Sequence, residues 1–136
     1  MEEINQAIGI DIGGTKIAVG AVNANGIVAA RVEFATESAL GFDRAVQRTV
    51  AAINQVTTQA GWKRQGLCGI GIGCAGPVNP KRGTIHNPYT LPGWDGCDIV
   101  TPLNKTFSVP VYLENDADAA VLGEACAGAA RDFSNV

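Results

Sequence analysis

The chain has 136 residues, of which 46% are hydrophobic and 17% are charged, and its formal net charge is −3. This balance is typical of a folded globular domain and excludes a disordered chain, a collagen and a coiled coil. Because the ten lysines and arginines are scattered along a slightly acidic chain, we expect neither nucleic acid nor an anionic lipid surface among its partners.

The first third of the chain predicts three antiparallel strands. Apolar runs at 7–12 and 17–22 are separated by a glycine turn, and Asn25-Gly26 provides a second turn signal. Residues 27–34 then alternate between apolar and exposed positions, as a strand with one buried face does. The segment therefore indicates a meander of three strands.

The middle of the chain predicts a helix, a buried strand and a loop. From residue 42 to residue 60, apolar side chains recur every three or four positions, which indicates an amphipathic helix of about five turns. Residues 67–74 predict a strand buried on both faces, with glycines where another backbone or a ligand approaches closely. Residues 83–94 are rich in proline and asparagine and predict an ordered loop.

The last third predicts a short helix, a strand and a final helix. The short helix covers 98–107, the strand covers 110–113, and an alanine-rich helix follows to about residue 128. The predicted order is βββαβαβα, which is a single mixed α/β layer without an internal repeat or a linker.

Asp11-Ile-Gly-Gly-Thr-Lys16 forms the turn between the first two predicted strands. Its glycine backbone can direct N–H groups toward an anion such as phosphate. The segment has neither P-loop spacing nor the helix of a dinucleotide fingerprint, so the residues alone leave a plain β-turn and an anion site both open. In an anion site, Asp11 would hold magnesium through water, Thr15 would add a hydroxyl, and Lys16 would point to phosphate or to solvent.

Asn115 and Asp116 follow the last predicted strand, where ligands gather in open α/β sheets. The Asp116 carboxylate can accept a proton from a substrate hydroxyl, and the Asn115 amide can bind a neighbouring hydroxyl. The alternative is that one of the two caps the following helix. Glu114 and Asp118 compete with Asp116 as the base, and the spacing does not choose among them.

The remaining conspicuous residues predict no further chemistry. The cysteines and His86 lack the spacing of a zinc site or a redox pair, so we expect a loop histidine and buried free thiols. Trp94 is expected to pack in the core, and the alternative is that its ring face contacts a sugar, since it borders the predicted loop. The longest apolar stretches contain glycines and are too short to span a membrane, and the acidic start is unlike a signal peptide, so we expect a cytoplasmic protein without a membrane partner. The cysteines are Cys68, Cys74, Cys97 and Cys126.

Four segments, taken together and in order, resemble the ROK proteins, a family of sugar kinases and regulators in the actin/hexokinase/Hsp70 superfamily. They are Ile10-Asp-Ile-Gly-Gly-Thr-Lys-Ile-Ala18, Gly71-Ile-Gly-Cys-Ala-Gly-Pro-Val-Asn79, Leu91-Pro-Gly-Trp94 and Pro110-Val-Tyr-Leu-Glu-Asn-Asp-Ala-Asp-Ala-Ala-Val-Leu-Gly-Glu124. The resemblance runs from residue 8 to about residue 128. It implies an α/β fold, an actin-like ATPase lobe of the ribonuclease H-like type with a mixed five-stranded sheet.

The resemblance also implies a role for each matching residue. The ATP phosphates would be lined by Gly13, Gly14, Thr15 and Lys16, with Asp11 beside Mg²⁺. Sugar hydroxyls would be held by Gly76, Thr90, Asn115 and Asp116. Asp116 would be the catalytic base that deprotonates the hydroxyl attacking the γ-phosphate, in a reaction that depends mainly on alignment and charge neutralisation. Many relatives have asparagine in place of Thr90 and Asp118, so the sugar is not identified.

By the resemblance, the complete protein would be a homo-oligomer that phosphorylates a hexose or an N-acetylhexosamine with ATP and Mg²⁺. Because the family forms two-lobed clamps, residues 1–136 are expected to be the N-terminal lobe alone, without the C-terminal lobe and the family zinc site, and inactive by themselves. A sugar-sensing transcriptional regulator and a non-catalytic sugar-binding module are the alternatives. The start of the motif at residue 8 and the lack of a basic patch argue against the regulator, and the presence of Asp116 argues mildly against the binding module.

Overall fold

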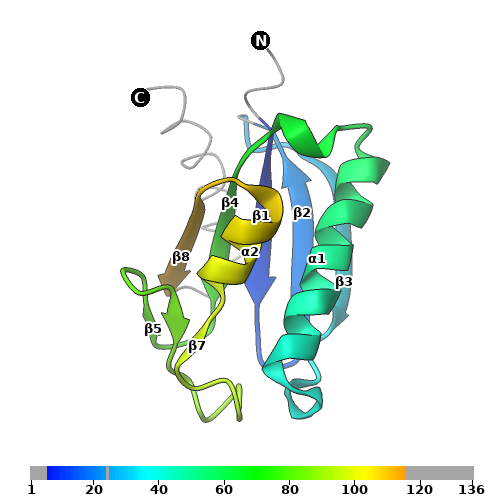
Figure 1. Ribbon diagram of the computed structural model, residues 1–136. Helices are drawn as coiled ribbons and strands as arrows, with labels where there is room; N and C mark the ends of the chain where they lie inside the picture. The colour runs from blue at the N-terminus through cyan, green and yellow to red at the C-terminus, as the bar shows by residue number, and fades with distance from the viewer. Residues whose placement is uncertain (1–5, 24, 116–136) are drawn as a thin grey trace.

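The computed structural model describes residues 6–23 and 25–115, which form a sheet with helices on one face. Strands β1 (Gln6–Ile12), β2 (Lys16–Val22) and β3 (Val28–Ala35) form the predicted antiparallel meander. Strands β4 (Leu67–Cys74) and β8 (Val111–Asn115) continue the sheet parallel to β1. Within this part of the chain the sheet has five strands in the order β3-β2-β1-β4-β8 (Figure 1).

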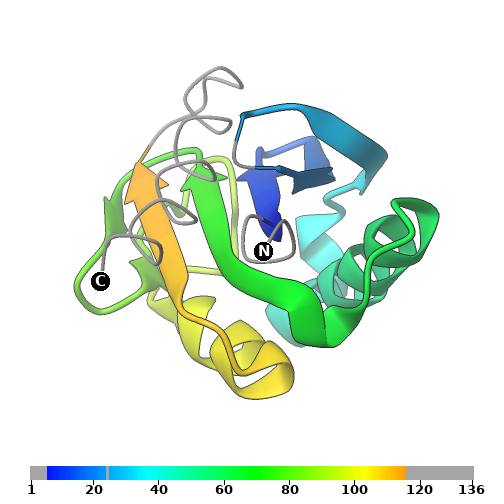
Figure 2. The same ribbon diagram turned by 90° about the horizontal axis from the view of Figure 1, so that it is seen from above.

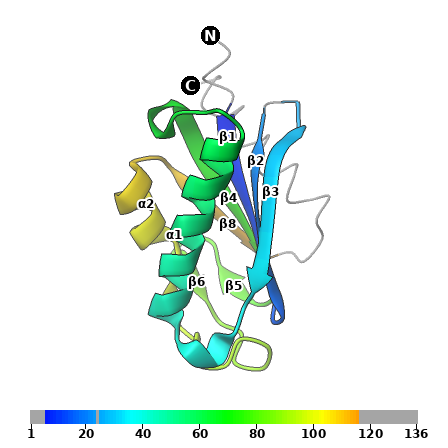
Figure 3. The same ribbon diagram turned by 90° about the vertical axis from the view of Figure 1, so that its right-hand side faces the viewer.

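Helices α1 (Phe42–Gln59) and α2 (Val100–Phe107) lie on the same face of the sheet (Figures 2 and 3). Short 3-10 turns, η2 (Ser38–Leu40) and η3 (Arg64–Gly66), flank α1. Helix α1 starts directly after Gly41, whose φ is 99°, and stops just before Gly61, whose φ is 76°. Because such positive φ angles favour glycine, the two glycines set both ends of the predicted five-turn helix.

The core lies between this face of the sheet and the two helices. Alternate residues of β1, namely Ile8, Ile10 and Ile12, are buried in one cluster with the inward side chains of α1 and α2. Full burial of such a side chain contributes about 1.5–3 kcal/mol. Trp94 is 1% exposed and meets the Phe42 ring edge-on, with ring centroids 5.4 Å apart, so its predicted packing role is confirmed.

Residues 78–98 differ from the predicted loop and helix. Three two-residue strands, β5 (Val78–Asn79), β6 (Thr84–Ile85) and β7 (Cys97–Asp98), pair into a small antiparallel sheet beside the ends of β4 and β8. Strands of two residues are too short to produce a hydrophobic period, so the sequence could not reveal them. The helix predicted to reach residue 128 lies outside the described residues.

The cysteines only partly match the expectation of buried thiols. Cys74 is buried, but Cys68 and Cys97 are half-buried, and all three are free. Cys97 lies in the short surface strand β7, which explains its partial exposure. Cys126 is outside the described residues. No helix in residues 6–23 and 25–115 is long and apolar enough to cross a membrane.

Candidate functional site

The carboxyl ends of the three parallel strands β1, β4 and β8 lie side by side. Their paired residues Ile12, Cys74 and Asn115 are called the strand-end row below. Ile12 of β1 pairs with Cys74 of β4, and Cys74 pairs with Asn115 of β8. One residue earlier, Asp11 pairs with Gly73. Because side chains alternate along a strand, Asp11 projects to the face opposite the buried Ile12. This end of the sheet therefore carries polar side chains on two of the strands, Asp11 on β1 and Asn115 on β8, at the position where α/β sheets bind ligands.

The glycine turn between β1 and β2 is held at its carbonyl oxygens. The Gly13 N–H donates to the Lys16 carbonyl over 2.9 Å. Thr36, which is fully buried just after β3, donates its hydroxyl to the Gly13 carbonyl over 2.7 Å and its N–H to the Thr15 carbonyl over 2.9 Å. Within the described part of the chain, the N–H groups of Gly14 and Thr15 make no hydrogen bond. The turn thus exposes donors suited to an anion.

Thr36→Val should lower the free energy of unfolding by about 1 kcal/mol, because a buried hydroxyl bond to the turn is lost while the side-chain volume is kept. Urea unfolding of the 136-residue chain, followed by circular dichroism, measures the change. Thr57→Val is the matched control, since Thr57 is also buried but its hydroxyl binds only Ile53 within helix α1. An equal loss in both variants would show that Thr36 does not support the turn in particular.

The Asn87–Thr90 turn packs directly on the glycine turn. A Cβ on Gly14 would lie 2.9 Å from the Thr90 carbonyl oxygen and 3.2 Å from Thr90 Cβ, so only glycine allows this approach. Asn87, which is 6% exposed, anchors the turn: its amide donates to the Ala75 carbonyl over 3.1 Å and to the Thr90 hydroxyl. The Thr90 N–H returns a 3.1 Å bond to Asn87 Oδ1. The predicted phosphate and sugar residues Gly14 and Thr90 are therefore neighbours.

Gly76 and Asn115 are also brought together. A Cβ on Gly76 would lie 2.5 Å from Asn115 Oδ1, which is closer than any real side-chain contact allows. The preceding residue, Ala75, donates its N–H to the Ile12 carbonyl over 2.9 Å, so this turn is fixed to the end of β1. Two of the residues predicted to hold sugar thus share one corner of the strand-end row.

The other predicted site residues have different surroundings. Lys16 is exposed, and its Nζ lies 4.0 Å from Glu33 Oε1 on β3. Asp11 is half-buried at the end of β1, and Thr15 is exposed in the glycine turn. No three histidine, cysteine, aspartate or glutamate side chains converge among the described residues. Asp116 lies outside the described residues.

His86 was predicted to be a loop residue without a metal, whereas Asn87 was given no role in the site. His86 lies in the small sheet region, where its Nε2 is 2.8 Å from the Thr84 hydroxyl, and no metal-ligand group forms around it in the described chain. Asn87 and Thr36 are the residues that the sequence reasoning did not single out. Asn87-Pro-Tyr-Thr90 carried a usable signal, because asparagine side chains often bind the backbone a few residues ahead in turns. A lone threonine such as Thr36 carries no comparable signal.

The buried thiol of Cys74, in the strand-end row, should make the free energy of unfolding depend on pH. Burial, followed by the nearby Asp11 carboxylate, raises the pKa of the Cys74 thiol from 9.0 to about 12. The folded thiol therefore stays protonated where the unfolded thiol ionises, so its contribution to stability is complete below pH 9 and is lost between pH 9 and about 12. We expect the unfolding free energy to fall in that window by up to about 1.4 kcal/mol per pH unit from this group.

Cys74→Ala should flatten this part of the stability curve. Unfolding free energies measured between pH 8 and pH 11 would give the slopes of the two proteins, with Cys97→Ala as the control at a half-buried thiol. Only the slope is compared, because the smaller alanine side chain also lowers stability at every pH. Parallel curves for the wild-type chain and Cys74→Ala would contradict the raised pKa.

The sequence model of the ROK family matches residues 7–136. Glucokinase of Thermotoga maritima is 30% identical over 131 residues, which are 95% of this chain and 39% of that enzyme. The xylose repressor of Bacillus subtilis is 31% identical over 84 residues, which are 62% of this chain and 21% of the repressor. Kinases and regulators thus both occur among the relatives.

The fold has a solved counterpart in a ROK family glucokinase from Streptomyces griseus in complex with glucose and AMPPNP. The two chains superpose with a TM-score of 0.70 and 32% identity, over 85% of this chain and 35% of the glucokinase. The predicted fold class, an actin-like α/β lobe with a mixed five-stranded sheet, is confirmed. The chain spans about two fifths or less of the length of these relatives.

Proposed function

Because the chain belongs to the ROK family, we propose that it is the N-terminal lobe of a two-lobed kinase that transfers the γ-phosphoryl group of ATP to a hydroxyl of a hexose or an N-acetylhexosamine. The observation that carries the proposal is the contact between Gly14 and Thr90. It brings a turn with unused N–H donors against a turn with an ordered hydroxyl, as a reaction between a phosphate and a sugar requires.

In the proposed kinase, separate groups of residues in this chain would bind the phosphates, orient the sugar and accept the proton. The N–H groups of Gly14 and Thr15 would hold phosphate oxygens, and Lys16 would turn from Glu33 toward the nucleotide. Asn115 and Thr90 would orient the acceptor sugar beside Gly76, and Asp116 would take the proton of the attacking hydroxyl. Such alignment accounts for most of the catalysis in phosphoryl transfer.

A magnesium ion at Asp11 would neutralise charge on the transferring phosphate when it is bound. Asp11 suits this role because it is the penultimate residue of β1, two residues before the glycine turn begins at Gly13. The hard oxygen donors of Asp11 and Thr15 favour magnesium over a soft metal.

A coupled ADP-release assay on the complete protein tests the proposal. The acceptors are glucose, mannose, N-acetylglucosamine and N-acetylmannosamine, and ribitol serves as a non-ring control. Saturable turnover with at least one of the four sugars is expected. Binding of a sugar without any turnover in the presence of ATP and Mg²⁺ would instead support a regulator or a binding module, which the xylose repressor among the relatives represents.

The same assay on the 136-residue chain tests the lobe assignment. A kinase of this design closes two lobes on its substrates, so the chain alone is expected to give no turnover even where it retains weak affinity for sugar. Turnover by the chain at the rate of the complete protein would contradict the assignment to one lobe.

A further inference from the structure

Strand β3 forms an edge of the sheet that no described element covers. It pairs only with β2 in residues 6–23 and 25–115, and Figure 3 views the molecule from this side, with α1 beside β3 and nothing of the described chain in front of it. The strand is eight residues long, whereas natural proteins usually shorten, cover or interrupt such edges. A long regular edge offers unpaired backbone groups to another strand.

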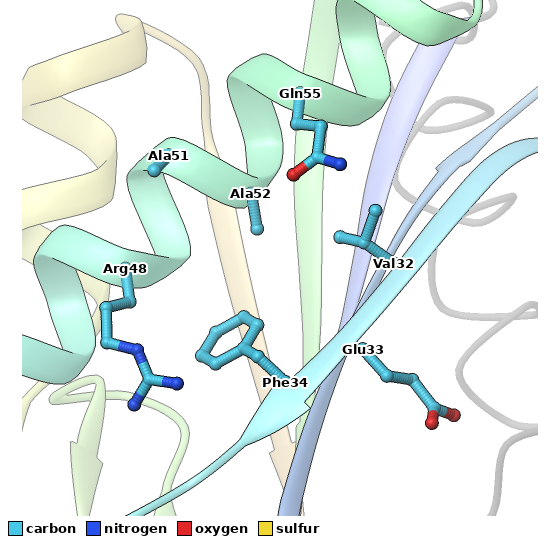
Figure 4. Close-up of a pocket in the computed structure, with 7 residues that line it drawn as sticks. All are labelled: Val32, Glu33, Phe34, Arg48, Ala51, Ala52 and Gln55. Atoms are coloured by element: carbon cyan, nitrogen blue, oxygen red, sulfur yellow. The ribbon is translucent and has the colours of Figure 1, made fainter.

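A groove runs along the helix side of this edge. Its volume is about 460 Å³, and Figure 4 shows Val32 and Phe34 of β3 facing α1 across it while Glu33 points to the opposite face. The Arg48 guanidinium lies 4.7 Å from the centre of the Phe34 ring and 3.2 Å from Glu37, so the end of the groove near Phe34 is fixed by packing and charge. The helix side of the groove carries the small residue Ala51.

The two charged residues of β3, Arg31 and Glu33, could each face the opposite charge on a second, antiparallel copy of the strand. Arg31 and Glu33 are exposed and lie on either side of Val32, so the alternation of the strand places both on the face opposite α1. Arg31 donates to Glu33 over 2.6 Å, and this hydrogen bond and the Arg31 charge lower the pKa of the Glu33 carboxyl. If two copies of β3 were placed antiparallel with their Val32 residues opposite each other, each Arg31 would stand opposite a Glu33.

We propose that β3 pairs antiparallel with β3 of a second copy of this chain, about a two-fold axis at Val32. In this register Arg31 stands opposite the partner's Glu33, and Ala30 stands opposite the partner's Phe34, so charges and volumes match on both faces. The two sheets become one continuous sheet, and the α1 helices of the two copies approach along Ala51. An isologous contact of this kind closes with two subunits and leaves no free β3 edge.

Charge exchange tests the register. Sedimentation equilibrium of the 136-residue chain should show a monomer–dimer equilibrium, and Arg31→Glu should weaken it about tenfold or more, because two glutamates then face each other on each side of the axis. The double variant Arg31→Glu/Glu33→Arg reverses every charge and should restore the dimer. Circular dichroism checks that each variant folds, as expected for exposed side chains. A wild-type chain that stays monomeric, or an Arg31→Glu dimer of unchanged strength, would overturn the pairing.

A cross-link tests the axis directly. In the proposed dimer the two Val32 Cα atoms lie about 5 Å apart, within the range of a disulfide, so Val32→Cys should yield covalent dimers on mild oxidation. Ala29→Cys is the matched control on the same strand, since its two copies would be roughly 20 Å apart. The measurement is repeated on the complete protein and requires no kinase activity, so its outcome is separate from that of the proposed function. Equal cross-linking of both variants would overturn the axis at Val32.

Discussion

Replacing Asp116 by asparagine in the complete protein is expected to lower kcat about 10²- to 10⁴-fold while the dissociation constant of the sugar changes little. A positioned general base contributes a factor of this size, and asparagine keeps the shape and the hydrogen-bonding oxygen of aspartate while it cannot take a proton. The coupled assay gives kcat, and calorimetry without nucleotide gives sugar affinity. A fall in kcat with retained binding is the signature of an interaction made in the transition state.

The neighbouring carboxylates provide the controls. Glu114 pairs with Gly73 in the sheet, in the row of Asp11 and not in the row of Asn115. Because Asn115 and not Glu114 lies against the sugar-side Gly76, Glu114→Gln should leave kcat within a few fold, and Asp118→Asn is expected to do the same. A drop as large as that of Asp116→Asn in either control would move the role of the base to that residue. Retained turnover in Asp116→Asn would remove Asp116 from the mechanism.

Gly14→Ala should weaken sugar binding about tenfold, although Gly14 belongs to the proposed phosphate turn. The new Cβ would stand 2.9 Å from a backbone oxygen of Thr90, so the Asn87–Thr90 turn must move. Overpacking of this kind costs about 1–3 kcal/mol, and 1.4 kcal/mol is a factor of ten in affinity. Sugar affinity of the complete protein, measured by calorimetry in the absence of ATP, isolates the effect from any change in nucleotide binding.

Gly13→Ala is the control for this substitution. A Cβ there meets only the Lys16 carbonyl, at 3.3 Å, and no residue of the Asn87–Thr90 turn. We expect Gly13→Ala to change nucleotide affinity more than sugar affinity. If both variants weakened sugar binding equally, the contact between Gly14 and Thr90 would not be the cause.

The regular elements could be predicted from the sequence because each has a clear period or glycine boundary. The alternation of β3 and the spacing of apolar residues in α1 gave both elements within a residue or two. The small sheet beside the site could not be predicted in this way. Its strands have two residues each and are held by tertiary contacts, such as the burial of Ile85, that leave no local pattern.

The candidate site was predictable residue by residue only through the resemblance to a family. The structure adds relations that no spacing contains. Gly14 was predicted as a donor of N–H groups, but its missing side chain also lets the Asn87–Thr90 turn approach. Thr36 lies 23 residues from Gly13 in the sequence, so its bond to that turn exists only once β2 and β3 have paired.

The strand-end row and the Asn87–Thr90 turn differ in how easily their residues can be exchanged between related proteins. Ile12, Cys74 and Asn115 are locked by the hydrogen bonds of adjacent strands, so a shift of one strand end would disturb its neighbours. The turn is held mainly by the side chain of Asn87, and its Thr90 hydroxyl can be exchanged for another group without rebuilding the sheet. In the proposed kinase, new specificities would therefore arise by exchanging residues of this turn, while the shared strand ends would keep the phosphoryl chemistry intact.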